Sequence, residues 1–89
     1  MTIILVTYDL KKPGRNYADV HTYLRQYTHC KHLESVYLLD TSASTGKIRD
    51  DLTKLIDNDD ITFVVKLARD WSSWDYLCSD WLNRPERNW

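Results

Sequence analysis

Residues that interrupt regular structure are scarce in this sequence, which has two glycines and two prolines among its 89 residues. Disordered chains are rich in such residues and poor in aromatic ones, whereas here 43% of the residues are hydrophobic and 12% are aromatic. The composition therefore excludes a disordered protein. A chain of this length folds as one domain with a small core, which buries roughly 60–65% of the surface exposed on unfolding.

The sequence also lacks an excess of charge of one sign, because 12 Lys and Arg nearly balance 13 Asp and Glu. Nonspecific binding of nucleic acid needs a clustered excess of basic residues, so any basic site must be local. No apolar run is long enough to span a bilayer, and no secretory leader is evident. We therefore predict a cytoplasmic protein.

Cysteine is scarce as well, with only Cys30 and Cys78 in the chain. Neither has a second cysteine at the spacing of a metal site. Because the chain shows no sign of export, we expect both thiols to be reduced, with a disulfide as the less favoured alternative.

An apolar run over residues 3–6, Ile-Ile-Leu-Val, predicts a strand that is covered on both faces and is therefore central in its sheet. This strand ends at Asp9, beside a loop over residues 11–15 that carries three cations and a Pro-Gly pair. Two interpretations of Asp9 follow. It is either a carboxylate that binds the amides of the turn, or a metal-binding or catalytic carboxylate at a strand end where ligands gather.

Apolar spacings of three and four predict two helices, one over about residues 17–28 with Asn16 as its cap and one that begins after Ser44. The second helix ends at Asp57-Asn58-Asp59-Asp60, where three acids suggest calcium. The spacing of an EF-hand is missing, so a solvated turn is favoured.

Two further strands are predicted after the first. The run over residues 32–41 breaks its alternation near Ser35, which a bulge or a handover between two short strands would explain. Residues 61–67 form a strand with one strongly apolar face, made by Ile61, Phe63, Val65 and Leu67.

The order of these elements predicts an α+β fold, a ferredoxin-like sandwich with split β-α-β units and two helices on one face of the sheet. The other face would leave an apolar patch larger than monomers tolerate, so a second subunit or the tail must cover it. We divide the chain into a domain over residues 1–68 and a Trp-rich helical tail over residues 69–89, which packs on the domain or on its dimer mate.

In that tail, Ser72 or Ser73 can cap a helix that ends before Pro85. The apolar stripe of this predicted helix comprises Trp74, Leu77, Cys78, Trp81 and Leu82. Burial is the favoured role of the tryptophans, and the alternative is a surface for a partner, with Trp81 or Trp89 as the anchor.

Three segments carry a resemblance to a known group: Leu5-Val6-Thr7-Tyr8-Asp9-Leu10 with the basic residues after it, His32 to Leu39, and Ser44 with Ile48-Arg49-Asp50. They resemble SinR-family proteins, which are similar to the smaller subunit of the CRISPR spacer-adaptation complex and to VapD-type toxins. The resemblance implies a ferredoxin-like fold, a homodimer paired through its sheets, and a small phage or bacterial protein.

The resemblance also implies a site. In the adaptation subunit, an Asp that closes the first strand has been proposed to hold a divalent metal at the dimer axis and to promote phosphodiester cleavage, and Asp9 takes that position here. Two such carboxylates could share one Mg²⁺. Lys11, Lys12 and Arg15 could then contact phosphate.

Three functions remain open. The favoured one is a homodimer that binds a macromolecular partner, either protein or nucleic acid, without catalysis. The alternative is a metal-dependent endonuclease of RNA or DNA that uses Asp9, and only this function calls for a cofactor, Mg²⁺. The third is nucleic-acid binding without cleavage, through Lys11, Lys12 and Arg15, with Arg84, Arg87 and Trp89 as further candidates.

Overall fold

The computed structural model describes residues 1–11 and 17–89 of the chain. Within them the elements are β1 (Thr2–Asp9), α1 (Ala18–Arg25), β2 (Thr28–Cys30), β3 (Val36–Thr41), α2 (Thr45–Thr53), β4 (Ile61–Lys66) and α3 (Cys78–Leu82). No helix in these residues is long and apolar enough to cross a membrane.

The strands form one sheet in the order β2-β3-β1-β4, and every neighbouring pair is antiparallel. Strands β1 and β2 are therefore parallel with β3 between them, and β3 and β4 are parallel with β1 between them. This arrangement is the split β-α-β pattern of a ferredoxin-like fold. The predicted fold class and the central position of β1 are confirmed.

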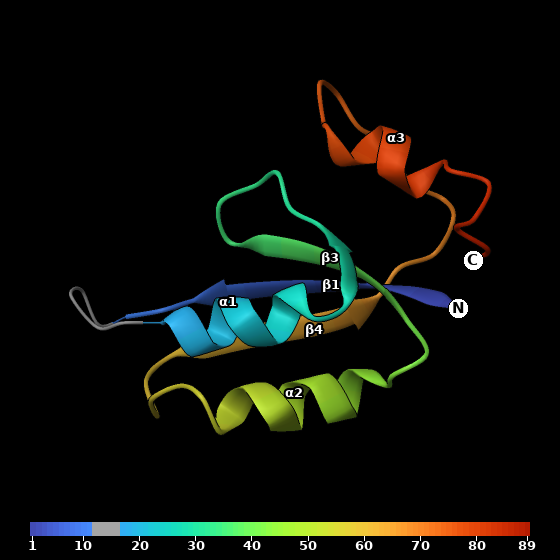
Figure 1. The fold of residues 1–89 in the computed structure, drawn as a ribbon. Helices are drawn as coiled ribbons and strands as arrows, with labels where there is room; N and C mark the ends of the chain where they lie inside the picture. Colours follow the sequence, from blue (N-terminus) through green and yellow to red (C-terminus); the bar gives the residue numbers. More distant parts are fainter. Residues whose placement is uncertain (12–16) are drawn as a thin grey trace.

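One face of the sheet packs against α1 and α2, as Figure 1 shows. Alternate β1 residues point to this face because successive side chains of a strand point in opposite directions. Val6 lies opposite Tyr37, and Ile4 lies opposite Leu39. The first core, as we call it, contains Ile4, Val6, Tyr8, Val20, Leu24, Tyr37, Leu39, Ile48 and Leu52.

The opposite face of the sheet carries α3 and the chain around it (Figure 1). The second core, as we call it, contains Ile3, Leu38, Cys78, Trp81 and Leu82, with Trp71, Tyr76 and Trp89 packed against it. Tail and sheet therefore contact each other within one chain. The division of the chain into a domain and a tail remains a prediction.

The tail is less helical than predicted, because α3 spans only Cys78–Leu82. Asp75 has a φ of 53°, a left-handed backbone conformation that ends any regular helix. As a result Trp74 and Leu77 leave the predicted stripe and are 94% and 73% exposed.

The segment between the two predicted helices also differs from expectation. Helix α1 ends at Arg25, and the next three-residue strand, β2, lies where the helix was expected to end. Residues 31–35 connect β2 to β3, so the predicted run over residues 32–41 is a strand only from Val36 onward, where its alternation was expected to break. The predicted cap Asn16 lies outside the described residues, whereas the Ser44 cap is confirmed by the Lys47 amide, which donates to Ser44 Oγ at 3.1 Å.

The expectation of reduced thiols is wrong for this structure, in which Cys30 and Cys78 form a disulfide. The tail folds back over the second face and places α3 beside the edge strand β2, so the two Cα atoms lie 5.9 Å apart. A sequence separation of 48 residues gave no sign of this proximity.

Candidate functional site

Asp9 is the last residue of β1 and lies opposite Ile61 of β4. Its side chain is 61% exposed, and Lys11 Nζ lies 2.6 Å from Asp9 Oδ2. The hydrogen bond to Asp9 is the main cause that raises the pKa of Lys11. An ion pair this exposed adds little stability, because water screens it and both side chains lose freedom.

Within one chain, Asp9 does not make a magnesium site. Mg²⁺ prefers several oxygen ligands in octahedral geometry, and Asp9 offers one carboxylate that already faces an ammonium group. Among residues 1–11 and 17–89, no group of three or more His, Cys, Asp or Glu side chains could hold a metal ion. A second carboxylate would have to come from another copy. Lys12 and Arg15, the other predicted phosphate contacts, lie outside the described residues.

A polar hollow of about 270 Å³ adjoins Asp9 and is lined by Tyr8, Asp9, Leu10, His21, Glu34 and Ser35. His21 Nδ1 lies 3.0 Å from the hydroxyl of the buried Tyr37, which fixes the orientation of the imidazole ring. Burial, with help from Arg25 and Lys31, lowers the pKa of His21. Burial also raises the pKa of Tyr8 to about 12. The hollow therefore presents an uncharged imidazole and a neutral phenol at neutral pH.

Sequence reasoning missed this grouping of His21 with Tyr8 and Tyr37. Their rings lie about 6 Å apart, with centroid separations of 6.1 Å for Tyr8–His21 and 6.0 Å for His21–Tyr37. The three residues come from β1, α1 and β3, so only the fold brings them together. The signal available in the sequence was the alternation of side chains along β1 and β3, which places Tyr8 and Tyr37 on the same face of the sheet.

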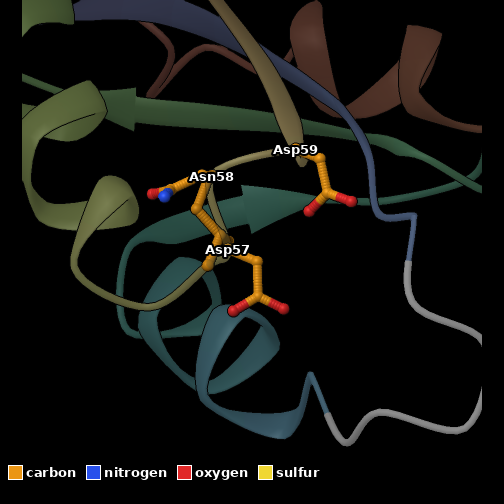
Figure 2. A pocket seen from close by; sticks show the side chains of 4 residues that line it. Asp57, Asn58 and Asp59 are labelled. Carbon is orange, nitrogen blue, oxygen red and sulfur yellow. The ribbon is translucent and has the colours of Figure 1, made fainter.

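The acidic turn after α2 ties backbone segments together. Asp60 Oδ1 accepts from the Lys11 amide at 2.7 Å and from the Tyr17 hydroxyl, and its Oδ2 accepts from the Asp57 amide. Figure 2 shows the Asn58 side chain turned away from that of Asp59, beside a hollow of about 480 Å³. These contacts are those of a turn, as the sequence favoured.

An exposed apolar surface lies on the second face of the sheet, outside the part that the tail covers. Phe63 and Ile61, which lie opposite Thr7 and Asp9, are 61% and 54% exposed. The predicted apolar face of β4 is therefore only partly covered. The open half, as we call it, comprises Leu5, Thr7, Val36, Ile61, Phe63 and Val65, the others being half-buried.

An apolar groove of about 430 Å³ runs between this open half and the tail. Exposed Leu33 and Trp74 lie at its margins. Its lining residues are Leu5, Leu33, Val36, Leu38, Leu67, Trp71, Ser72, Ser73, Trp74, Tyr76 and Leu82. The groove therefore extends the open half toward the second core.

Of the two tryptophans predicted as partner anchors, Trp81 belongs to the second core and Trp89 packs against it. Trp81 is 7% exposed, and the Arg87 guanidinium lies 4.2 Å from the centre of its ring. Trp89 is half-buried, and its Nε1 donates to the Leu82 carbonyl at 3.2 Å. Trp74 is instead the most exposed large apolar side chain of the described residues. A partner role for Trp81 and Trp89 remains a prediction that their packing does not favour.

Comparison with known proteins gives one match. A family model described as CRISPR associated protein Cas2 matches residues 1–73. Comparison with curated proteins and with solved structures finds no match. The matched stretch contains all of β1 to β4 and ends before α3, so Cys78 and most of the second core's tail residues lie beyond it.

Proposed function

Because the chain belongs to the family of CRISPR associated protein Cas2, we propose that it acts as a homodimer that binds a macromolecular partner. The observation that carries this proposal is the open half of the second sheet face, where Phe63 and Ile61 expose more than half of their surface. Contiguous exposed apolar surface of this kind marks interaction sites in soluble proteins. A second copy that packs its own open half there would remove both patches from water at once.

Sedimentation equilibrium of the purified chain tests the pairing. We expect a dimer at micromolar concentrations, and we expect Phe63→Glu to weaken it strongly, because the change places a charge within the apolar surface. Thr22→Glu is the matched control, since it adds the same charge at an exposed position of α1. A wild-type chain that stays monomeric in both its oxidised and its reduced form would contradict the proposal.

The class of partner is tested by the effect of salt. Lys11 is exposed and its ammonium group pairs with the carboxylate of Asp9, so it can exchange that carboxylate for a phosphate. If the partner is a nucleic acid, affinity should fall steeply with added salt, because bound cations on the phosphates are released on binding. An affinity that does not change with added salt would indicate that the partner is a protein.

The second candidate function is a metal-dependent endonuclease, and the position of Asp9 favours it. Asp9 shares the second face with the open half, at the end of β1, so pairing of two copies through that face with their β1 strands running in the same direction would bring two carboxylates toward a common rim. Two carboxylates and water can satisfy Mg²⁺. Asp9→Asn should then abolish Mg²⁺-dependent cleavage of RNA or DNA, while Asp19→Asn, an exposed acid in α1, should not.

Equal cleavage by wild type and Asp9→Asn would identify a contaminating nuclease and leave the interaction function. The finer likeness to SinR-family proteins and VapD-type toxins, the phage or bacterial origin and the cytoplasmic location stay predictions. They do not alter either experiment.

A further inference from the structure

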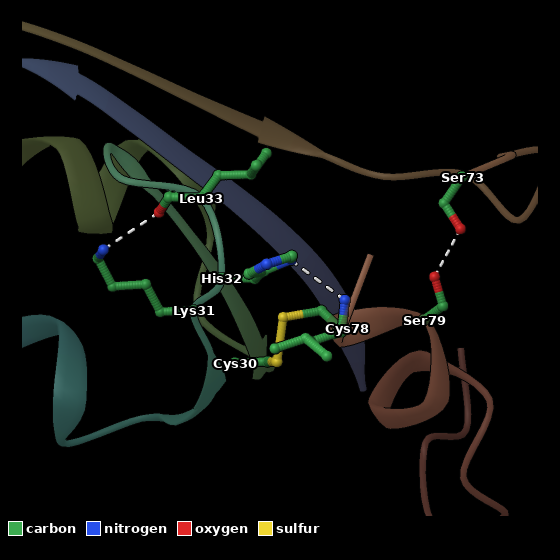
Figure 3. Close-up of a disulfide and its surroundings, with 8 residues drawn as sticks. Cys30, Lys31, His32, Leu33, Ser73, Cys78 and Ser79 are labelled. Carbon is green, nitrogen blue, oxygen red and sulfur yellow. Dashed lines mark hydrogen bonds between the residues drawn. A yellow bond between two sulfur atoms is a disulfide. The ribbon is translucent and has the colours of Figure 1, made fainter. Parts of the chain in front are cut away.

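Side-chain contacts hold the tail against the rest of the chain, and two of them join it to strands of the sheet. The disulfide joins Cys30 of the edge strand β2 to Cys78, the first residue of α3 (Figure 3). Near the end of the chain, Arg87 Nη1 lies 3.2 Å from Asp40 Oδ2 of β3, and both side chains are more than nine-tenths buried. The tail is therefore anchored at the first residue of α3 and again at Arg87, beyond the end of that helix.

The part of the second sheet face that lies beneath the tail is continuous with the open half. The tail residues of the second core cover Ile3 and Leu38. Leu5, two residues along β1, and Val36, two residues along β3, line the groove beside the open half. Residues two apart on a strand point to the same face. The tail thus covers one part of a single apolar surface and leaves the other part open.

The ion pair is a weak tie compared with the disulfide. Among the described residues, Asp40 Oδ1 and Arg87 Nε are buried without a hydrogen-bond partner. Burying a charged pair whose remaining polar atoms are unsatisfied loses hydration that the pair does not restore. Release of the tail would return water to both groups, so the ion pair constrains the tail less than the covalent bond does.

The chain between the sheet and the disulfide can accommodate such a release. No helix or strand is present between Lys66 and Cys78 in the described chain, and Trp74, Asp75 and Leu77 within this connection are exposed. Motion of the tail therefore breaks no element of the sheet or of the first core.

We infer that the Cys30–Cys78 disulfide controls how much of the second sheet face a second copy can occupy. With the disulfide formed, the tail covers Ile3 and Leu38, and only the open half is available. With the disulfide reduced, the tail leaves and the whole face can pair. This inference rests on the proposed homodimer and states what regulates its formation.

The reductant is a dithiol. Its thiolate attacks Cys30 Sγ, because Cys30 is half-buried on an edge strand whereas Cys78 is fully buried. The S–S bond breaks, Cys78 leaves as a thiolate that takes up a proton, and the second thiol of the reductant displaces Cys30 from the mixed disulfide. Two electrons and two protons pass to the cysteines, and the reductant becomes a disulfide.

The test compares the full chain in oxidised form, after reduction by dithiothreitol, and as the double variant Cys30→Ser with Cys78→Ser. Hydrogen exchange of the α3 amides reports release of the tail, and sedimentation equilibrium reports pairing. We expect exchange at α3 to accelerate by about tenfold or more in the reduced and double-variant chains. The dimer dissociation constant should fall by about tenfold or more in both. First-core amides, such as those of Leu24 and Leu39, that stay better protected than those of α3 show that the domain remains folded when the tail is released.

Two results would overturn the inference alone. One is an α3 that stays as protected as in the oxidised chain although thiol labelling shows both cysteines free. The other is a dissociation constant that is equal in both redox states; that result leaves the proposed homodimer standing. A chain that is monomeric in both states overturns the inference and the homodimer together. The double variant, treated with dithiothreitol, must show no further change, which separates the disulfide from other effects of the reductant.

Discussion

The two faces of the sheet are covered in different ways. The first face lies under two helices that the chain forms between its strands, and its core runs from Ile4 to Tyr8 along β1. The second face is covered at one end only, by a tail that follows the last strand and is fixed by a disulfide. The first face is therefore covered by helices that are part of the fold and that stabilise it. The second face is covered by a segment that can move away when the disulfide is reduced.

Removal of the disulfide should have the largest effect on the difference between the two faces. Removing it with Cys30→Ser and Cys78→Ser, or by reduction, should lower the free energy of unfolding by up to about 4 kcal/mol, because the bond closes a loop of 48 residues in the unfolded chain. Urea unfolding of both forms measures the difference. A loss close to zero would mean that the tail is held by its packing alone, and the contrast between the faces would weaken.

Matched leucines on the two faces give the next effect. Leu24→Ala in the first core should destabilise the chain by about 3 kcal/mol, since it leaves a cavity in a core that cannot collapse. Leu82→Ala in the second core should reduce the free energy of unfolding less, because the tail can leave the sheet and avoid the cavity. Urea unfolding measures both variants. Equal losses would show that the two faces unfold as one unit.

The first face was the one that the sequence predicted well. Four consecutive apolar residues marked β1 as central, helical spacing located α1 and α2, and the Ser44 hydroxyl caps α2 as its position before Ile48 suggested. These signals are local, since each depends on residues within one or two turns or on strand alternation.

The second face depended on information that local patterns do not contain. Periodicity placed Trp74 in a helical stripe, but the left-handed backbone at Asp75 excludes it. The three-residue strand β2 is too short to give an alternating pattern, so the partner of Cys78 could not be located. Asp9 and Lys11 are close in sequence and their pairing was accessible, whereas the contact of His21 with Tyr37 required the packing of α1 on β3.

The smallest expected effect is a loss of folding stability at acidic pH, and it arises at the first face. The pKa of His21 is below its ordinary value of about 6.5, chiefly because the ring is partly buried and also because Arg25 and Lys31 lie near it. Unfolded chains therefore take up a proton at His21 more readily than folded ones, so stability is complete above about pH 6.5 and declines as the pH falls through the lowered pKa. His21→Gln keeps a side-chain oxygen for the Tyr37 hydroxyl and removes the titration. We expect the urea midpoint of the variant to fall less than that of wild type between pH 7 and pH 5. The control is His32→Gln, a change at an exposed histidine beside the tail, which should leave the fall of the urea midpoint between pH 7 and pH 5 as large as in wild type. If the fall disappears in His32→Gln but persists in His21→Gln, the acid sensitivity belongs to the second face.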